Sequence, residues 1–236
     1  MKYAFILLMV ALIGVSTISH ASENWTGDGG KEMSITILAP KATGLEENQS
    51  HLPALVQGEF VSNFSSYSAI SVLDWERLDK IYSHLLSDEY SDDERERVDL
   101  GNLTHTTHIM DGKITKTATG YHLQMNIIKT NDKITAASYS KTFTFAELDD
   151  LTGIRQTSLE LLQKMGVTLT AKAQEELAGA ATANHVSAQT ALARGVTAQR
   201  QGTEVAALSY YYQAAAFDPS LLEATKRSSV MVANIS

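Results

Sequence analysis

"GYHLQMNIIKTNDKITAASYSKTF", residues 120–143, is the stretch of sequence from which the fold can be predicted. Apolar and largely polar residues alternate through its first half, and a period of two residues is typical of a β-strand that buries one face. The apolar series is Tyr121, Leu123, Met125 and Ile127, and the residues between them are His122, Gln124, Asn126 and Ile128. Asn131-Asp132 then has the composition of a turn, and residues 133–145 continue as a second strand. This part of the chain is therefore predicted to be an antiparallel hairpin.

"LTHTTHIMDGKI", residues 103–114, precedes this hairpin and allows two interpretations. On a helix, His105 and His108 would share a face and could bind a metal ion, as in a metal-dependent hydrolase, whereas on a strand they would point to opposite faces. The threonines and the Asp111-Gly112 pair favour a strand, with this pair as the turn between residues 107–110 and 113–117. Since no third ligand is identifiable, we assign no metal site and expect a β-meander.

Further strands and helices are predicted on both sides of the meander. The predicted strands are residues 33–39 and 69–73, and apolar residues recur at helical spacing after Pro53, after Asp74 and over residues 147–165. Gly166 stands where the C-terminus of a helix favours glycine. This order predicts an α/β (α+β) domain over residues 33–170.

The composition is that of a globular protein with an acidic surface. Of the 236 residues, 44% are hydrophobic and 19% are charged, which is enough apolar material for one core and a smaller appendage. The net charge of −8 leaves no excess of basic side chains to neutralise phosphates, so we expect no nucleic acid partner.

The N-terminus has the features of a secretory signal. Lys2 precedes an apolar run over residues 3–15, and small and polar residues follow, so residues 1–21 are predicted as a signal peptide and residues 22–32 as a flexible leader. The apolar run is too short for a stable membrane anchor, and no membrane span is expected after cleavage. Leu12 to Val15 looks like a lipoprotein processing box with Val15 in place of the acylated cysteine, so we expect no lipid. The chain has no cysteine, which excludes disulfides, thiolate metal sites and cysteine nucleophiles.

Motifs for catalysis or cofactor binding are missing from the sequence. No serine lies in Gly-x-Ser-x-Gly or Ser-x-x-Lys, and Gly27 to Gly30 lacks the following helix and the Lys-Ser/Thr of a phosphate-binding loop. The carboxylates of residues 88–99 could be paired as in a glycosidase, but a charge-rich segment is more often a solvated face. We therefore predict a protein without enzymatic activity, catalytic residues or cofactor.

The last part of the chain, residues 171–236, is predicted to be helical. Over residues 188–224 it resembles a single tetratricopeptide repeat, because Gly195, Ala207, Tyr211, Ala214 and Pro219 fall at the small, aromatic and proline positions of that repeat. Arg194 departs from the pattern, in which a large apolar residue is usual. One helical hairpin cannot bury its own core, so it must dock on the first domain, on a partner or on further repeats.

Residues 33–166 resemble the superfamily that contains the curli-secretion component CsgG and the penicillin-binding-protein activator LpoB. The resemblance rests on the order of several phrases, which are "ITILAP", "LVQGEFVSNF", "ISVLDWERLDKIY", "HIMDGKITKT" and "GYHLQMNIIKT" followed by "KITAASYS". It implies a mixed β-sheet with helices packed on it, and a non-catalytic role in the bacterial cell envelope. Two such roles follow from the resemblance: an activator or adaptor that binds a peptidoglycan synthase, or a subunit of an outer-membrane secretion complex, which would be a homo-oligomer.

We favour the activator-like role, in the periplasm or at the outer membrane without a lipid anchor, because no segment reads as the transmembrane hairpins of a channel subunit. A cluster of aromatic residues offers rigid apolar area for a protein interface. The residues that we predict for contact with a partner are Tyr210, Tyr211, Tyr212 and Phe217. Packing in the core is the alternative for at least two of them.

Overall fold

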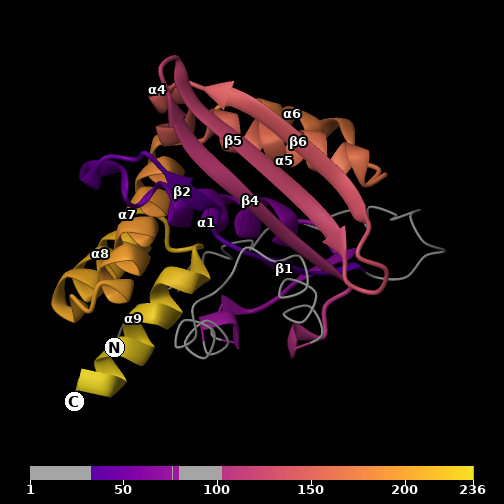
Figure 1. The fold of residues 1–236 in the computed structure, drawn as a ribbon. Helices are drawn as coiled ribbons and strands as arrows, with labels where there is room; N and C mark the ends of the chain where they lie inside the picture. The colour runs from indigo at the N-terminus through magenta and orange to yellow at the C-terminus, as the bar shows by residue number, and fades with distance from the viewer. Residues whose placement is uncertain (1–32, 76, 80–102, 236) are drawn as a thin grey trace, which may run out of the picture.

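The computed structural model describes residues 33–75, 77–79 and 103–235 (Figure 1). The predicted signal peptide, the leader and the acidic residues 88–99 lie outside the described residues. The strands are β1 (Met33–Ile37), β2 (Lys41–Thr43), β3 (Ile70–Val72), β4 (His108–Thr117), β5 (Gly120–Lys129) and β6 (Thr135–Phe143). The helices are a short 3₁₀ turn (Glu47–Gln49), α1 (Leu52–Ser65), α4 (Phe145–Asp149), α5 (Thr152–Lys164), α6 (Ala171–Ala178), α7 (Ala183–Arg200), α8 (Glu204–Phe217) and α9 (Leu222–Ile235).

These strands form one mixed sheet of six strands, so the predicted fold class is confirmed. The order is β3-β1-β4-β5-β6, and β2 pairs with β4 beyond the end of β1. β1 runs parallel to both of its neighbours, whereas β4, β5 and β6 form an antiparallel meander. The hairpin predicted over residues 120–143 is present as β5 and β6, with Asn131-Asp132 in the turn between them.

The Asp111-Gly112 pair does not make a turn, and this part of the sequence prediction is wrong. Both residues lie inside β4, which runs without interruption from His108 to Thr117 and turns only before Gly120. Gly112 pairs with Met125, and a Cβ atom on Gly112 would lie 2.2 Å from the backbone oxygen of Gln124. The glycine is therefore needed for the close approach of β5 and not for a turn conformation.

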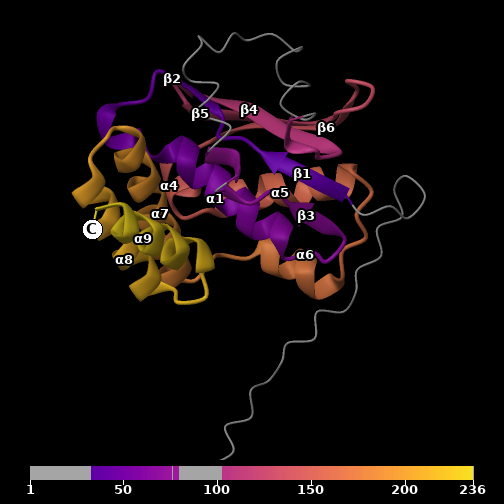
Figure 2. The same cartoon turned by 90° about the horizontal axis from the view of Figure 1, so that it is seen from below.

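The main core lies between the sheet and the helices α1 and α5, which both lie on the same side of it in Figure 2. Buried apolar side chains of the strands meet those of the two helices there, which is why one residue in two is apolar along β5. Fully buried members of this core include Met110, Leu123, Met125, Ile127, Leu55, Phe60, Phe64, Ile154 and Leu161.

A row of polar side chains runs across the three antiparallel strands. Asp111, Asn126 and Ser138 are neighbours in the register of β4, β5 and β6. Asn126 donates to Asp111 at 3.2 Å, and Ser138 donates to the Asn126 side-chain oxygen at 2.8 Å. These hydrogen bonds join polar side chains on the face of the sheet that carries Asn126, which is opposite to the face of the apolar residues of β5.

The helix predicted over residues 147–165 is two helices. Leu151 has a left-handed backbone (φ 70°) and is fully buried, so the chain bends between α4 and α5 to place this side chain in the core. Gly166 follows α5 with φ 77°, as its position at a helix C-terminus predicts.

The C-terminal part contains more helix than the predicted hairpin. α7 and α8 form that hairpin, α9 packs on α8, and α6 packs on α5 beside the sheet. α7 packs on α1, so the hairpin docks on the first domain, which is one of the three arrangements expected from the sequence. Within the described residues, no helix is both long and apolar enough to cross a membrane.

Candidate functional site

The four aromatic residues predicted to contact a partner lie on α8 in different environments. Tyr211 is completely buried and Tyr210 is half-buried against the core, so for these two the core-packing alternative describes the structure. Tyr212 and Phe217 are 55% and 44% exposed. Only these two present substantial apolar area at the surface.

Tyr211 is buried because it packs against a glycine of α7. A Cβ atom on Gly195 would lie 2.5 Å from Cε1 of Tyr211, so only glycine admits the ring at this depth. The Tyr211 hydroxyl donates to the side-chain oxygen of Gln199 at 2.5 Å. Burial raises the pKa of Tyr211 to about 12, so the phenol is neutral at any physiological pH.

Exposed apolar side chains are concentrated on α8 and α9. Of the nine large hydrophobic side chains that are exposed in the described part of the chain, six belong to these two helices of 14 residues each. They are Val205, Tyr212, Phe217, Leu222, Val230 and Val232, which we call the C-terminal apolar residues. Val205 and Tyr212 are seven positions apart and therefore share one face of α8. Contiguous exposed apolar area is typical of a surface that another molecule covers, so the face of α8 that carries Val205 and Tyr212 is the candidate interface.

His185 of α7 attaches the helical unit α7–α9 to the sheet domain, which contains the six strands with α1, α4 and α5. His185 Nε2 lies 2.8 Å from Oε2 of Glu59 on α1, and His185 Nδ1 lies 3.5 Å from Oδ2 of Asp218 at the end of α8. Arg155 of α5 lies 3.8 Å from the other Glu59 oxygen and donates to the backbone oxygen of Glu176. The hydrogen bond to Glu59 raises the pKa of His185 against the opposing effect of burial.

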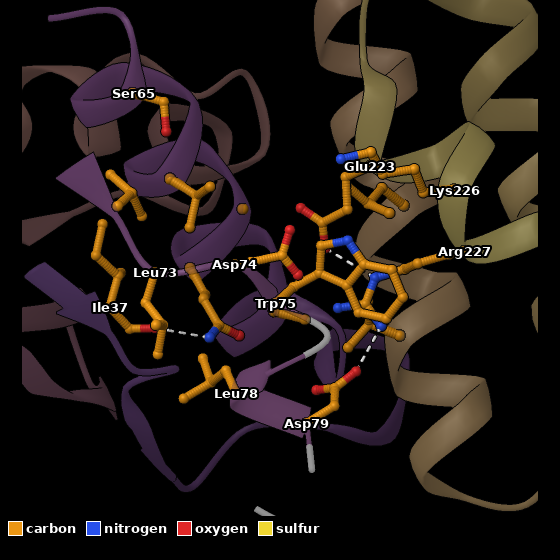
Figure 3. Close-up of a pocket in the computed structure, with 17 residues that line it drawn as sticks. Ile37, Ser65, Leu73, Asp74, Trp75, Leu78, Asp79, Glu223, Lys226 and Arg227 are labelled. Carbon is orange, nitrogen blue, oxygen red and sulfur yellow. Dashed lines mark hydrogen bonds and ion pairs between the residues drawn. The ribbon is translucent and has the colours of Figure 1, made fainter. Parts of the chain in front are cut away.

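A second attachment is made by Arg227 of α9 (Figure 3). Its guanidinium lies 3.9 Å from the centre of the Trp75 ring and forms ion pairs of 2.8 Å with Asp79 and Glu223. Arg227 is only 6% exposed. Burial acts to lower the pKa of Arg227, but the carboxylates of Glu223 and Asp79 together raise it, so the charge is kept inside the protein.

A cavity of about 200 Å³ adjoins Arg227, between α1, β3 and the C-terminal helices. Its walls combine aliphatic and polar side chains, and its charged residues are Asp74, Asp79, Glu223, Lys226 and Arg227, as Figure 3 shows. The charge of Arg227 is already paired with Asp79 and Glu223, so the Arg227 guanidinium is not available to an anionic ligand in the cavity.

His105 and His108 do not form a metal site with other residues of the described part. His105 is exposed in a turn with φ 54°, whereas His108 is buried at the start of β4 with its Nδ1 2.9 Å from the Thr107 hydroxyl. No group of three or more His, Asp or Glu side chains suited to a metal ion occurs among the residues that the structure describes.

Glu59, His185 and Arg227 were not singled out from the sequence. Glu59 did carry a signal, because it is a lone charge at the helical spacing of the buried residues Leu55, Val56, Phe60 and Asn63. His185 and Arg227 carried none, because each is one polar residue in a helix with many polar residues.

No protein-family model matches the sequence, and no curated protein matches it significantly. Solved structures with a similar fold include the LpoB C-terminal domain from Salmonella enterica, with 10% identity over 50% of this chain and 87% of that chain and a TM-score of 0.37. The LpoB C-terminal domain from Escherichia coli has 8% identity over 48% and 83% of the two chains, with a TM-score of 0.38. The lipoprotein GNA1162 from Neisseria meningitidis has 12% identity over 58% and 99%, with a TM-score of 0.40. LpoB belongs to the superfamily that residues 33–166 resemble, and similarity at this level says nothing about activity or partners.

Proposed function

We propose that this chain is an exported, non-catalytic protein of the bacterial cell envelope that binds and activates a peptidoglycan synthase through its C-terminal helices. The observation that carries the binding role is the concentration of exposed apolar side chains on α8 and α9. Export is supported by the signal-like residues 1–21, and the activator role by the sequence resemblance of residues 33–166.

The physical reason is the cost of leaving these side chains in water. Covering one large aliphatic or aromatic side chain contributes about 1.5–3 kcal/mol. Val205 is 82% exposed and Tyr212 is more than half exposed, so a partner that covers both gains from each. α8 is packed through the buried Tyr211, and its neighbours α7 and α9 are attached to the sheet domain by His185 and Arg227, which lowers the entropy lost on binding.

The test is site-specific crosslinking in the native envelope from a photoreactive residue placed at Tyr212. A matched position is Ile134, which is 59% exposed but lies in the turn between β5 and β6. We expect position 212 to trap a peptidoglycan synthase and position 134 to trap none. Equal trapping at both positions, or a trapped protein of another class, would contradict the proposal.

A second measurement separates binding from folding. Tyr212→Ser and Phe217→Ser should each raise at least tenfold the concentration of this protein that is required to stimulate the purified synthase. The free energy of unfolding of each variant should stay within about 0.5 kcal/mol of that of the original chain. Ile134→Ser is the control and should change neither quantity. Ring-shaped oligomers in detergent would instead favour the secretion-complex role.

A further inference from the structure

His185 lies where the C-terminal helices meet the sheet domain, and its two ring nitrogens face carboxylates from two different elements. Glu59 belongs to α1 and is completely buried. Asp218 follows α8, and its side chain is about one-fifth exposed. The imidazole is thus placed between one carboxylate of the sheet domain and one of the helical unit.

The hydrogen-bonding capacity of imidazole decides which charge state fits this position. A neutral imidazole has one N–H donor and one acceptor nitrogen, whereas the protonated ring donates from both nitrogens. Carboxylates only accept when they are ionised. Only the protonated ring can therefore serve Glu59 at 2.8 Å and Asp218 at 3.5 Å together.

The surrounding charges lead to the same conclusion. Arg155 on α5 supplies one positive charge near Glu59, so with a neutral His185 the group of Glu59, Asp218 and Arg155 keeps one unbalanced negative charge. A protonated His185 balances the group. The other charged residues of the cleft of about 680 Å³ beside His185 come from α6, and they are Lys172, Glu175 and Glu176. Lys172 and Glu176 form an exposed pair with each other at 3.6 Å.

We propose that His185 is a pH-sensitive attachment point: its protonated ring holds α7 and α8 to α1, and the attachment weakens when the proton leaves. This inference does not depend on the proposed function. The pKa of His185 is raised by the Glu59 hydrogen bond, so its stabilising contribution is complete below the ordinary value of 6.5 and is lost as the pH rises through the higher folded value. The C-terminal helices should therefore be held most firmly in acid.

The first experiment follows the imidazole resonances by NMR during a pH titration of the full chain. We expect the His185 signal to titrate above 6.5 and to move towards that value in Glu59→Gln, which keeps the size of the side chain and removes the charge. A His185 signal that titrates at or below 6.5 in the original chain would overturn the proposal.

The second experiment measures whether the proton acts on the attachment. We expect the urea midpoint of the original chain to fall between about pH 6 and about pH 9, and this fall to be absent from His185→Gln. His122→Gln is the matched control, because His122 lies on β5 and contacts Thr142 instead of a carboxylate, and it should keep the original pH dependence.

Hydrogen exchange locates the effect in the structure. On raising the pH, after correction for the intrinsic exchange rate, amides of α7 should lose protection by a larger factor than those of β5. The proposal fails if α7 and β5 lose protection equally, or if His185→Gln keeps the pH dependence of the original chain. Should His185→Gln not fold, the comparison of α7 with β5 in the original chain still decides between the two outcomes.

Discussion

Gly112 lies in the middle of β4 because the neighbouring strand leaves no room for a side chain. A Cβ atom there would be 2.2 Å from the Gln124 backbone oxygen and 2.3 Å from the sulfur of Met125. Neither atom is at the end of an exposed flexible chain, since Met125 is itself fully buried. A methyl group at this position must therefore move the backbone of β5 or the core behind it.

Gly112→Ala should accordingly lower the free energy of unfolding by about 1–3 kcal/mol or more, measured by urea denaturation. Lys113→Ala is the matched control, because Lys113 is the next residue of β4 and its side chain is exposed, and it should change stability by no more than about 0.5 kcal/mol. A neutral Gly112→Ala would contradict the inference that β5 lies too close to β4 to admit a side chain at this position.

The first turn of α4 begins with a reciprocal pair of hydrogen bonds. The Thr144 hydroxyl accepts from the Glu147 backbone N–H at 3.2 Å, and the Thr144 backbone N–H donates to the Glu147 carboxylate at 2.7 Å. The backbone hydrogen bond from Thr144 lowers the pKa of Glu147, so the contribution of this pair is present above the ordinary pKa of that carboxyl and is lost as the pH falls through the lowered value.

Thr144→Ala should cost about 0.5–2 kcal/mol, because it removes the cap that starts α4 after the end of β6. Thr142→Ala serves as the control. Thr142 is exposed at the end of β6, and its hydroxyl contacts the ring of His122 instead of capping a helix. Thermal unfolding of both variants near neutral pH measures the difference, and equal transitions would argue against the cap.

Successive tyrosines of α8 have opposite roles because the helix turns by about 100° between them. Tyr211→Ala removes a fully buried ring packed against Gly195 and should cost about 3–5 kcal/mol. Tyr212→Ala removes a ring that is more than half exposed and should cost less than about 0.5 kcal/mol. Denaturation of the two variants in urea compares the same change at adjacent positions, and a similar loss in both would show that α8 packs in another register.

Arg227 joins the last helix to a segment about 150 residues earlier in the chain. Its ion pair with Asp79 spans 148 positions, and its guanidinium covers the Trp75 ring. Removing the guanidinium leaves Asp79 and Glu223 close together without a cation and uncovers the indole. The fastening of α9 to the sheet domain is therefore expected to depend on this residue.

Arg227→Met should reduce stability by about 3–5 kcal/mol, and hydrogen exchange should show the loss of protection first in α9. Lys226→Met changes a neighbouring cation that is exposed and should have little effect on either measurement. Uniform loss of protection throughout the described helices would mean that Arg227 stabilises the fold as a whole and does not fasten α9 in particular.

Several parts of the fold and of the candidate site could be predicted because they depend on local pattern. The apolar alternation from Tyr121 to Ile127 defines a strand with one buried face, and it became β5 with that face in the core. Gly166 marks the end of α5 for a reason that acts within one turn of helix. The aromatic cluster on α8 was visible in the sequence, although the burial of each ring was not.

Other features depend on which residues meet across the layers, and no local pattern reports that. Asp111-Gly112 has the composition of a turn, but β5 approaches so closely that the glycine is required inside a strand. Leu151 interrupts a regular helical period, since its backbone is left-handed while its side chain is buried in the core. Glu59 and His185 are 126 positions apart in sequence and 2.8 Å apart in the structure.

The sequence by itself thus determined the type and order of most elements, since hydrophobic period and terminal signals act between residues a few positions apart. Only the tertiary structure decided the path of β4, the break between α4 and α5, and the buried charges that hold the C-terminal helices in place. The reason is that burial pairs groups through packing of distant segments, and the cost of an unpaired buried charge is set by that packing and not by the neighbours in sequence.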